Sequence, residues 1–233
     1  MKRYLARLSV CLVVLSSLST WTIAEDGSPL AWSGFYVGGQ FGASNLAGTL
    51  ESLDYCQGAG QCVSDFSASQ ILAGVVAGYD LVTGNLVIGG ELSASAKFGE
   101  AGSLLQGFDS YQGDWMTSSP WEASALARVG VLVTPDFLAF VSGGATIAGF
   151  DLANANCPQC AEWEDVNLHG DTRVGWTLGV GGELAINDNW HVRAQYLHSD
   201  FGDYHAEGAS EGYEYSSRIT SDAVKGGIVF RVR

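Results

Sequence analysis

Apolar and polar residues alternate along eight stretches of this chain, with the two-residue period of a β-strand that has one face in an apolar environment. In the first stretch Phe35, Val37 and Phe41 share one face, while Tyr36 and Gln40 lie on the other. The apolar faces of the other seven stretches lie within 71–79, 86–94, 123–133, 139–147, 174–186, 190–196 and 224–232. The pattern predicts eight strands, each with a continuous apolar face and an opposite face of small or polar residues.

The connections between these stretches are alternately short and long. The segments 81–85, 134–136 and 187–189 are short and rich in turn-forming residues. The long connections are predicted at 45–66, 98–120, 150–172 and 201–220. Bacterial outer-membrane barrels show this asymmetry. We therefore predict an all-β fold, an eight-stranded antiparallel up-and-down transmembrane barrel with short periplasmic turns and four long extracellular loops.

A soluble eight-stranded barrel or sandwich is the alternative fold, in which the same apolar positions would point into a core. Periodicity alone does not separate the two folds. Membrane barrels carry aromatic residues at both interfaces with the bilayer. The aromatic residues nearest the predicted short turns are Tyr79, Phe137, Trp190 and Phe230, and those nearest the long connections are Phe41, Phe98, Trp121, Trp176 and Phe201. This placement and the asymmetry of the connections favour the membrane barrel.

The first 24 residues have the pattern of a secretory signal peptide. Three basic residues precede an apolar run at 8–18, and Thr22-Ile23-Ala24 provides a small-x-small site before Glu25. Cleavage is expected between Ala24 and Glu25, which leaves 25–233 as the barrel domain. The apolar run is shorter than the 20 or so residues of a spanning helix, so export followed by removal is expected.

The composition agrees with a chain that keeps charge away from lipid. Only 15% of the residues are charged, where an ordinary soluble domain has roughly a quarter. The 25 acidic and 11 basic residues give a formal net charge of −14. Nucleic-acid binding needs a basic patch, so a nucleic-acid partner is not expected.

Charged residues inside the strands are expected to point into the lumen. Lys or Arg on the lipid side of a barrel costs about 2–4 kcal/mol at the bilayer midplane. The lumen of an eight-stranded barrel is just wide enough for side chains to fill it. We predict a lumen charge network that plugs the barrel, made by Glu91, Arg128, Glu183, Arg193 and Lys225. The alternative is that these residues line a selective pore.

Four cysteines follow the signal peptide, in two of the long connections. Cys56 and Cys62 lie in the first, and Cys157 and Cys160 in the third. Sequence-local disulfides are the simplest of the three connectivities in an oxidising periplasm. The Cys157-Pro158-Gln159-Cys160 segment also fits a redox motif or half a zinc site. A redox motif needs a strand–helix context and a zinc site needs a second ligand pair, and the sequence shows neither.

No residue pattern indicates an enzyme, a cofactor or a metal centre. Glu162, Glu164 and Asp165 are a cluster that either collects divalent cations or is a solvated acidic surface, and no EF-hand spacing is present. His198 and Ser199 are adjacent, so a regular strand places them on opposite faces, which is a poor arrangement for a base and a nucleophile. Hydrolysis that depends on His198 is the third function class considered.

Three segments resemble the small outer-membrane β-barrels of the surface immunogenic and opacity type, which are related to the OmpA barrel. Trp32–Gly42 is similar to their "W-x-G-x-Y-x-G-x-x-x-G" opening, 193–202 to "R-x-E-Y-x-Y-x-D-x-G", and 225–231 to the closing "G-x-x-Y-R-F". The chain departs from the pattern with Gln195, His198 and a last segment, Phe230-Arg231-Val232-Arg233, that does not end in an aromatic residue.

The resemblance implies a surface-exposed barrel of the bacterial outer membrane that has no established catalytic site. The expected function is envelope integrity and surface recognition through the loops. A small porin-like channel for solutes is the alternative. The implied partners are outer-membrane lipid and lipopolysaccharide, the barrel-assembly machinery, and a host or cell-surface ligand at the loops, with the protein itself a monomer.

Overall fold

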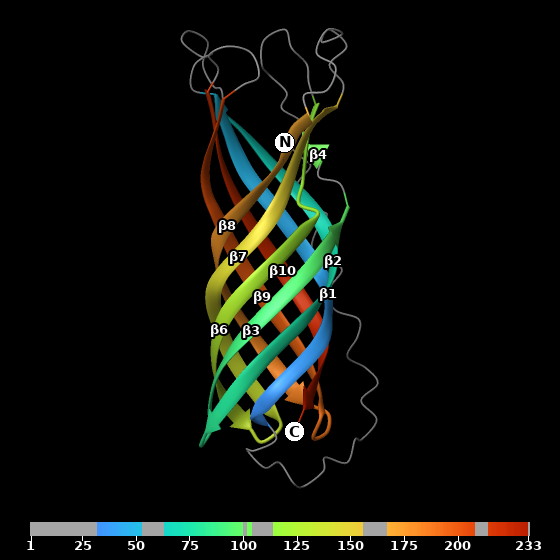
Figure 1. Ribbon diagram of the computed structural model, residues 1–233, viewed down its shortest axis with the longest axis vertical. Coiled ribbons are helices and arrows are strands. Elements are labelled where there is room, and N and C mark those ends of the chain that lie inside the picture. The colour runs from blue at the N-terminus through green and yellow to red at the C-terminus, as the bar shows by residue number, and fades with distance from the viewer. Residues whose placement is uncertain are drawn as a thin grey trace, which may run out of the picture.

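Eight long antiparallel strands close into a ring in the computed structural model, which describes residues 32–52, 63–99, 102–103, 114–155, 167–207 and 214–232. Each strand pairs with its neighbours in chain order, and β1 also pairs with β10 (Figure 1). The eight strands are β1 (Gly34–Ser52), β2 (Val63–Thr83), β3 (Leu86–Phe98), β6 (Trp121–Thr134), β7 (Phe137–Ala155), β8 (Asn167–Ala185), β9 (Trp190–Glu207) and β10 (Glu214–Val232). The predicted eight-stranded antiparallel barrel is confirmed.

Two short strands extend the ring at one place on its rim. β5 (Asp114–Ser118) pairs with the last residues of β7, beyond the part of β7 that pairs with β6, and β4 (Gly102–Ser103) pairs with β5. Ser119 and Pro120 separate β5 from β6, since proline has no amide hydrogen for the ladder. The Pro120 carbonyl still accepts a hydrogen bond from the Lys97 amide, at 2.8 Å.

The strands are staggered around the ring. Tyr36 pairs directly with Arg231 on β10. When the pairings are followed the other way around the barrel from Tyr36, they reach β10 at Ser221, ten residues from Arg231 along the strand. Such a stagger tilts the strands against the barrel axis. Side chains from distant positions in the ladder can therefore meet across the lumen.

The three predicted short connections are confirmed, and they define the turn end of the barrel, where β10 also ends (Figure 1). Gly84 and Asn85 join β2 to β3, and Gly84 has a φ of 64°, a conformation that glycine adopts readily. In the connection from β8 to β9, the Asn187 side-chain oxygen accepts hydrogen bonds from the amides of Asn189 and Trp190, at 3.0 and 2.9 Å.

At the opposite end, the loop end, the long strands continue into three of the four predicted long connections, so the boundaries 45–66, 150–172 and 201–220 are wrong. The boundaries 98–120 are confirmed, since β3 ends at Phe98 and β6 begins at Trp121, with the short strands β4 and β5 between them. The predicted boundary at Phe201 is a bulge inside β9. There the register shifts opposite Arg218 and Thr220, Gly202 has a φ of 73°, and its amide donates to Asp200 Oδ1 at 2.8 Å. Backbone pairing needs no apolar side chains, so the change in hydropathy marks the edge of the apolar wall and not the end of a strand.

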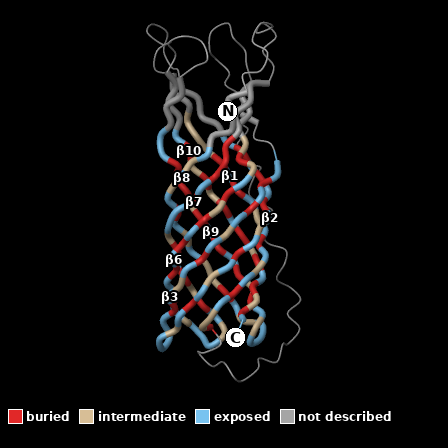
Figure 2. Tube along the Cα trace, viewed as in Figure 1, coloured by how far each residue is buried: buried red, intermediate tan, exposed pale blue. Residues whose placement is uncertain are grey.

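The two faces of the wall have the predicted chemistry, with the apolar face outward. Phe35, Phe41 and Val75 are each more than 60% exposed, whereas Tyr36 and Gln40 are buried. Buried and exposed residues alternate along the strands throughout the ring (Figure 2). The soluble alternative is thus excluded, because it would place the apolar residues inside.

Aromatic side chains gather near both rims of the apolar wall. At the turn end, the rings of Phe35 and Tyr79 are 4.6 Å apart, and those of Trp190 and Phe230 are 5.0 Å apart. Phe98, Trp121 and Trp176 are exposed near the loop end. The prediction for Phe201 is wrong, since this side chain is 6% exposed and points into the lumen next to the β9 bulge. Within the described residues, no helix has the length and apolarity that crossing a membrane requires.

The close approach of β1 to β10 generates a test of the wall. A Cβ at Gly42 would collide with the Val224 carbonyl oxygen and lie 2.9 Å from the Lys225 Cα, whereas a Cβ at Gly39 would meet nothing within 4 Å. We expect Gly42→Ala to lower the free energy of unfolding by about 1–3 kcal/mol, and Gly39→Ala to change it by less than about 0.5 kcal/mol. Urea titrations of the folded protein in detergent measure both, and equal effects would contradict the close approach.

Candidate functional site

Six charged side chains from six strands meet inside the barrel near the turn end. All are buried, and three carboxylates balance three guanidinium groups. We call them the turn-end network: Asp80, Glu91, Arg128, Glu183, Arg193 and Arg231. Their formal charges cancel, which limits the cost of burying them.

Glu91 on β3 is the acceptor for one half of this network. Arg193 donates two hydrogen bonds to its two carboxylate oxygens, at 2.6 and 2.7 Å. The Tyr36 hydroxyl donates to Glu91 Oε2 at 2.7 Å and accepts from Arg128 at 3.2 Å. A paired contact between guanidinium and carboxylate fixes both position and orientation.

Glu183 on β8 and Asp80 on β2 are the acceptors for the other half. Glu183 accepts from Arg128 at 3.1 Å and from Arg231 at 2.8 Å, and its Oε1 lies 3.1 Å from His191 Nδ1. Asp80 accepts from Arg231 at 2.8 Å and lies 3.3 Å from Arg128. Arg128 therefore joins the two halves.

An apolar cluster packs against the turn-end network, from the side of the short turns. It contains Trp32, Val87, Leu138 and Phe140. The Trp32 indole donates to the Pro135 carbonyl at 2.9 Å, and Arg231 donates to the Trp32 carbonyl at 2.6 Å. The Arg128 guanidinium lies 4.6 Å from the centre of the Phe140 ring. These contacts remove the network from water at this end.

A second, smaller group of charges lies further toward the loop end. Lys97 and Lys225 contact the two carboxylate oxygens of Glu122, at 2.6 and 2.7 Å. All three side chains are buried, and we call them the loop-end network. Its formal charge is positive by one unit.

Hydroxyl groups connect four neighbouring strands in the same part of the lumen. Ser124 and Thr146 lie 2.8 Å apart, Thr146 and Thr177 2.6 Å, and Thr177 and Ser199 2.8 Å. Each hydroxyl can donate to one neighbour and accept from the next. This row satisfies polar groups on β6, β7, β8 and β9 without any charge.

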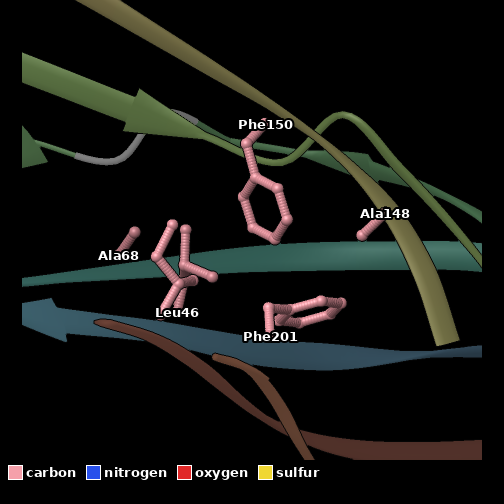
Figure 3. Close-up of a cluster of buried hydrophobic side chains, with 6 residues drawn as sticks. Leu46, Ala68, Ala148, Phe150 and Phe201 are labelled. Carbon is pink, nitrogen blue, oxygen red and sulfur yellow. The ribbon is translucent and has the colours of Figure 1, made fainter. Parts of the chain in front are cut away.

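Apolar side chains follow at the loop end of the described lumen. Leu46, Ala68, Ala148, Phe150, Phe201 and Ile219 form this cluster (Figure 3). The rings of Phe150 and Phe201 lie edge to face, with their centres 5.0 Å apart. The described lumen thus has an apolar cluster at each end, with ionic and hydroxyl contacts and a further apolar cluster around Leu126 between them.

The structure places all five predicted network residues inside the barrel. Glu91, Arg128, Glu183 and Arg193 form one connected group. The prediction that Lys225 belongs to the same group is wrong: it contacts Glu122. Alternation shows which way a side chain points, whereas its partner depends on the stagger of the ring.

Sequence reasoning missed Asp80, Lys97, Glu122 and the role of Arg231. The two-residue alternation could have predicted that they point inward. Asp80 follows the outward Tyr79 directly and so lies on the inner face, and Glu122 lies on the same face as Ser124. The two-residue period was not extended to the ends of the predicted strands, and Asp80, Lys97 and Glu122 lie there. A search for charged residues also could not find Tyr36, whose hydroxyl links Glu91 and Arg128.

The other candidate residues fall into two groups. His198 and Ser199 do lie on opposite faces, with Ser199 in the hydroxyl row and His198 on the outer wall beside Asp222. In the part of the chain that the structure describes, no group of three or more His, Cys, Asp or Glu residues could hold a metal ion. Outside the described residues lie Ala24, Glu25, Cys56, Cys62, Cys157, Cys160, Glu162, Glu164 and Asp165.

Comparison with known proteins supports the resemblance seen in the sequence. The model of the outer membrane protein beta-barrel domain family matches residues 8–217. The 31 kDa outer-membrane immunogenic protein of Brucella melitensis is 29% identical, over 82% of this chain and 79% of its own. The 22 kDa outer membrane protein of Rhizobium leguminosarum is 26% identical, over 80% and 74%.

A solved structure shares the fold. The outer membrane protein OprG from Pseudomonas aeruginosa superposes with a TM-score of 0.56, at 12% identity, over 86% of this chain and 97% of its own.

The turn-end network generates a stability test. Arg128→Ala or Glu183→Ala removes one partner and leaves buried charges without compensation, so each should lower the free energy of unfolding by about 3–5 kcal/mol. The double variant should lose less than the sum of the two.

Arg218→Ala is the matched control in this urea titration. Its side chain is 62% exposed and pairs with Asp200 at 2.7 Å, so its loss should lower the free energy of unfolding much less than either lumen variant does. Lumen variants that behave like this control would argue against a stabilising network.

Proposed function

Because this chain belongs to the outer membrane protein beta-barrel domain family, we propose that it is a structural and surface-interacting barrel of the bacterial outer membrane whose lumen is plugged by its own side chains. The observation that carries the proposal is the mutual pairing of the lumen charges. Every charged group of the turn-end network contacts an opposite charge inside the barrel, so its charges are balanced without a ligand.

The packing at the two ends of the lumen supports a plug. Trp32 and Phe140 lie beyond the ionic contacts at the turn end, and Phe150 and Phe201 lie beyond them at the loop end. An eight-stranded barrel has no spare width for a channel once such side chains fill it. The barrel then contributes to envelope integrity as a rigid wall component, and its chemistry is that of its surfaces.

The short turns are proposed to face the periplasm, and the loop end the outside of the cell, as in other bacterial barrels. Recognition of a host or cell-surface ligand would then occur at the loop end. The Brucella relative is named as an immunogenic protein, which agrees with surface exposure of the family. Lipopolysaccharide and outer-membrane lipid would surround the wall, and the barrel-assembly machinery would insert the monomer.

We infer that the protein is not an enzyme. His191 is enclosed between Glu183 and Trp32, and His198 points to the outer wall, away from Ser199. A base and a nucleophile must lie within hydrogen-bond reach of one another. Hydrolysis lost on His198→Ala would contradict this inference.

A small channel for solutes is the second candidate function. Gln40 Oε1, Gln195 Oε1 and Ser142 Oγ are buried and have no hydrogen-bond partner among the described residues. Water would satisfy such atoms, and a connected file of water is the minimum that a channel needs.

Conductance separates the two functions. Purified monomer in planar lipid bilayers should give no stable open channels, because the paired charges and aromatic side chains occupy the lumen. A porin added to the same bilayers afterwards controls for insertion and recording. Stable open channels formed by the monomer would contradict the plugged barrel and support the channel function.

The proposed orientation has its own test. An epitope tag placed between Glu207 and Glu214 should bind antibody on intact cells, whereas the same tag placed between Asp188 and Asn189 should bind only after the outer membrane is permeabilised. Heat-modifiable migration in gels shows that each tagged barrel is folded. The reverse pattern of accessibility would overturn the orientation.

A further inference from the structure

The outer wall carries one row of polar side chains across four strands. Ser69 on β2, Asn45 on β1, Asp222 on β10 and His198 on β9 are consecutive partners in the ladder, and none is buried. Tyr196, two residues before His198 on β9, completes what we call the polar patch. All of these side chains lie on the outer face, with the apolar positions of the same strands.

Hydrogen bonds hold the centre of the patch together. The Tyr196 hydroxyl donates to Asp222 Oδ1 at 2.5 Å, and His198 Nδ1 lies 2.8 Å from the same oxygen. Ser69 donates to the Asn45 side-chain oxygen at 3.3 Å. Both contacts to Asp222 use Oδ1, so Oδ2 remains an acceptor, and His198 Nε2 is free of the Asp222 contact.

The patch differs from the rest of the wall by its ionisable groups. On β3, β6, β7 and β8, the outward positions toward the loop end include Phe98, Trp121, Ile147, Val174 and Trp176, all exposed, and Thr172 is an uncharged polar residue among them. Polar and ionisable groups on a lipid-facing wall are unfavourable and usually have a functional reason. The paired lumen charges have partners within the chain, whereas the patch directs its remaining groups into the surroundings.

The groups that the patch presents are suited to a sugar. Carboxylate, amide and imidazole groups offer both acceptors and donors to hydroxyl groups. The Trp176 ring lies 5.6 Å from the His198 ring, and the Tyr196 ring is 45% exposed, so aromatic surface adjoins the polar atoms. Amphipathic aromatic rings are favoured where lipid meets the polar headgroups.

The local charge disfavours a phosphate as the main contact. Asp222 carries a negative charge, and the nearest cation on β10 toward the loop end, Arg218, is already paired with Asp200 at 2.7 Å. Asp203 adds another negative charge opposite Arg218. Hydroxyl and amide groups of a sugar can hydrogen-bond to a carboxylate without this repulsion.

We propose that the polar patch binds the sugar headgroup of a glycolipid in the outer leaflet, through its hydroxyl and amide groups. The acyl chains would lie against the apolar side chains of the same strands nearer the turn end, such as Val224 and Phe41, which are 60% and 68% exposed. The proposal rests on the orientation proposed above, with the loop end at the cell surface.

The test is native mass spectrometry of the mature protein released from detergent, with added lipid A, a phosphorylated and acylated glucosamine disaccharide. Phosphatidylglycerol, which has a phosphate but no sugar ring, is the comparison lipid. Wild type should retain lipid A, and the double variant Asp222→Leu/His198→Leu should retain about tenfold less. Thr172→Leu, an exposed outward position on β8, is the matched control and should retain lipid A like wild type.

Two further measurements separate the sources of binding. Asp222→Asn keeps a side-chain oxygen acceptor, so it should retain lipid A better than Asp222→Leu. If a divalent cation bridged the carboxylate to a phosphate instead, Asp222→Asn and EDTA would both abolish retention, which would overturn the proposal. Equal retention of phosphatidylglycerol by wild type, or a dimer that disappears with the double variant, would overturn it as well.

The measurements that would contradict the proposed function differ from those that would contradict the polar patch. Heat-modifiable migration shows that each variant is folded, and open channels or a reversed epitope pattern would count against the plugged, surface-facing barrel. Loss of the lipid A effect with those results unchanged would count against the patch alone.

Discussion

Each charged side chain of the two lumen networks contacts an opposite charge, because an apolar wall surrounds the lumen and the ring leaves little room for water. The turn-end network pairs three acids with three arginines, and in the loop-end network one acid is shared by two lysines, which leaves one formal positive charge. The apolar clusters around Trp32 and Phe150 follow from the same constraint, since they keep the ion pairs away from bulk water. The charged groups point inward and pair with one another there, which leaves the outer wall apolar.

The stagger of the ring makes this neutralisation feasible. Glu91 and Arg193 lie on strands that are not neighbours, and they meet because tilted strands bring different ladder positions to one height. A change of register by one residue would exchange the two faces of a strand and place its charges in lipid. The bulge at Gly202 changes the register of β9 locally. Phe201 therefore points into the lumen, and β9 continues beyond the bulge.

The sequence was sufficient for the number of strands, the short turns and the direction of each predicted charge. It was insufficient for the partners: Lys225 contacts Glu122 and not Glu91, because partnership across a lumen depends on stagger, which alternation does not encode. The strand ends at the loop side, apart from those of β3 and β6, were wrong for a different reason. Beyond the apolar belt the two-residue period has no hydrophobic contrast, although the backbone ladder continues, as it does from Leu46 to Ser52 on β1.

On the outer face, the same alternation identifies polar residues that lack a full set of partners within the chain. An inward polar residue such as Glu183 has partners inside the barrel, so its presence needs no other molecule. Asp222 points outward, from a wall where β3, β6 and β7 carry aromatic and aliphatic residues toward the loop end. Its contacts with Tyr196 and His198 use only one of its two oxygens. Polar groups in an apolar setting require partners. In the lumen the partners are other side chains of the barrel, whereas on the outer wall the unpaired polar groups of the patch point to a molecule in the surrounding membrane.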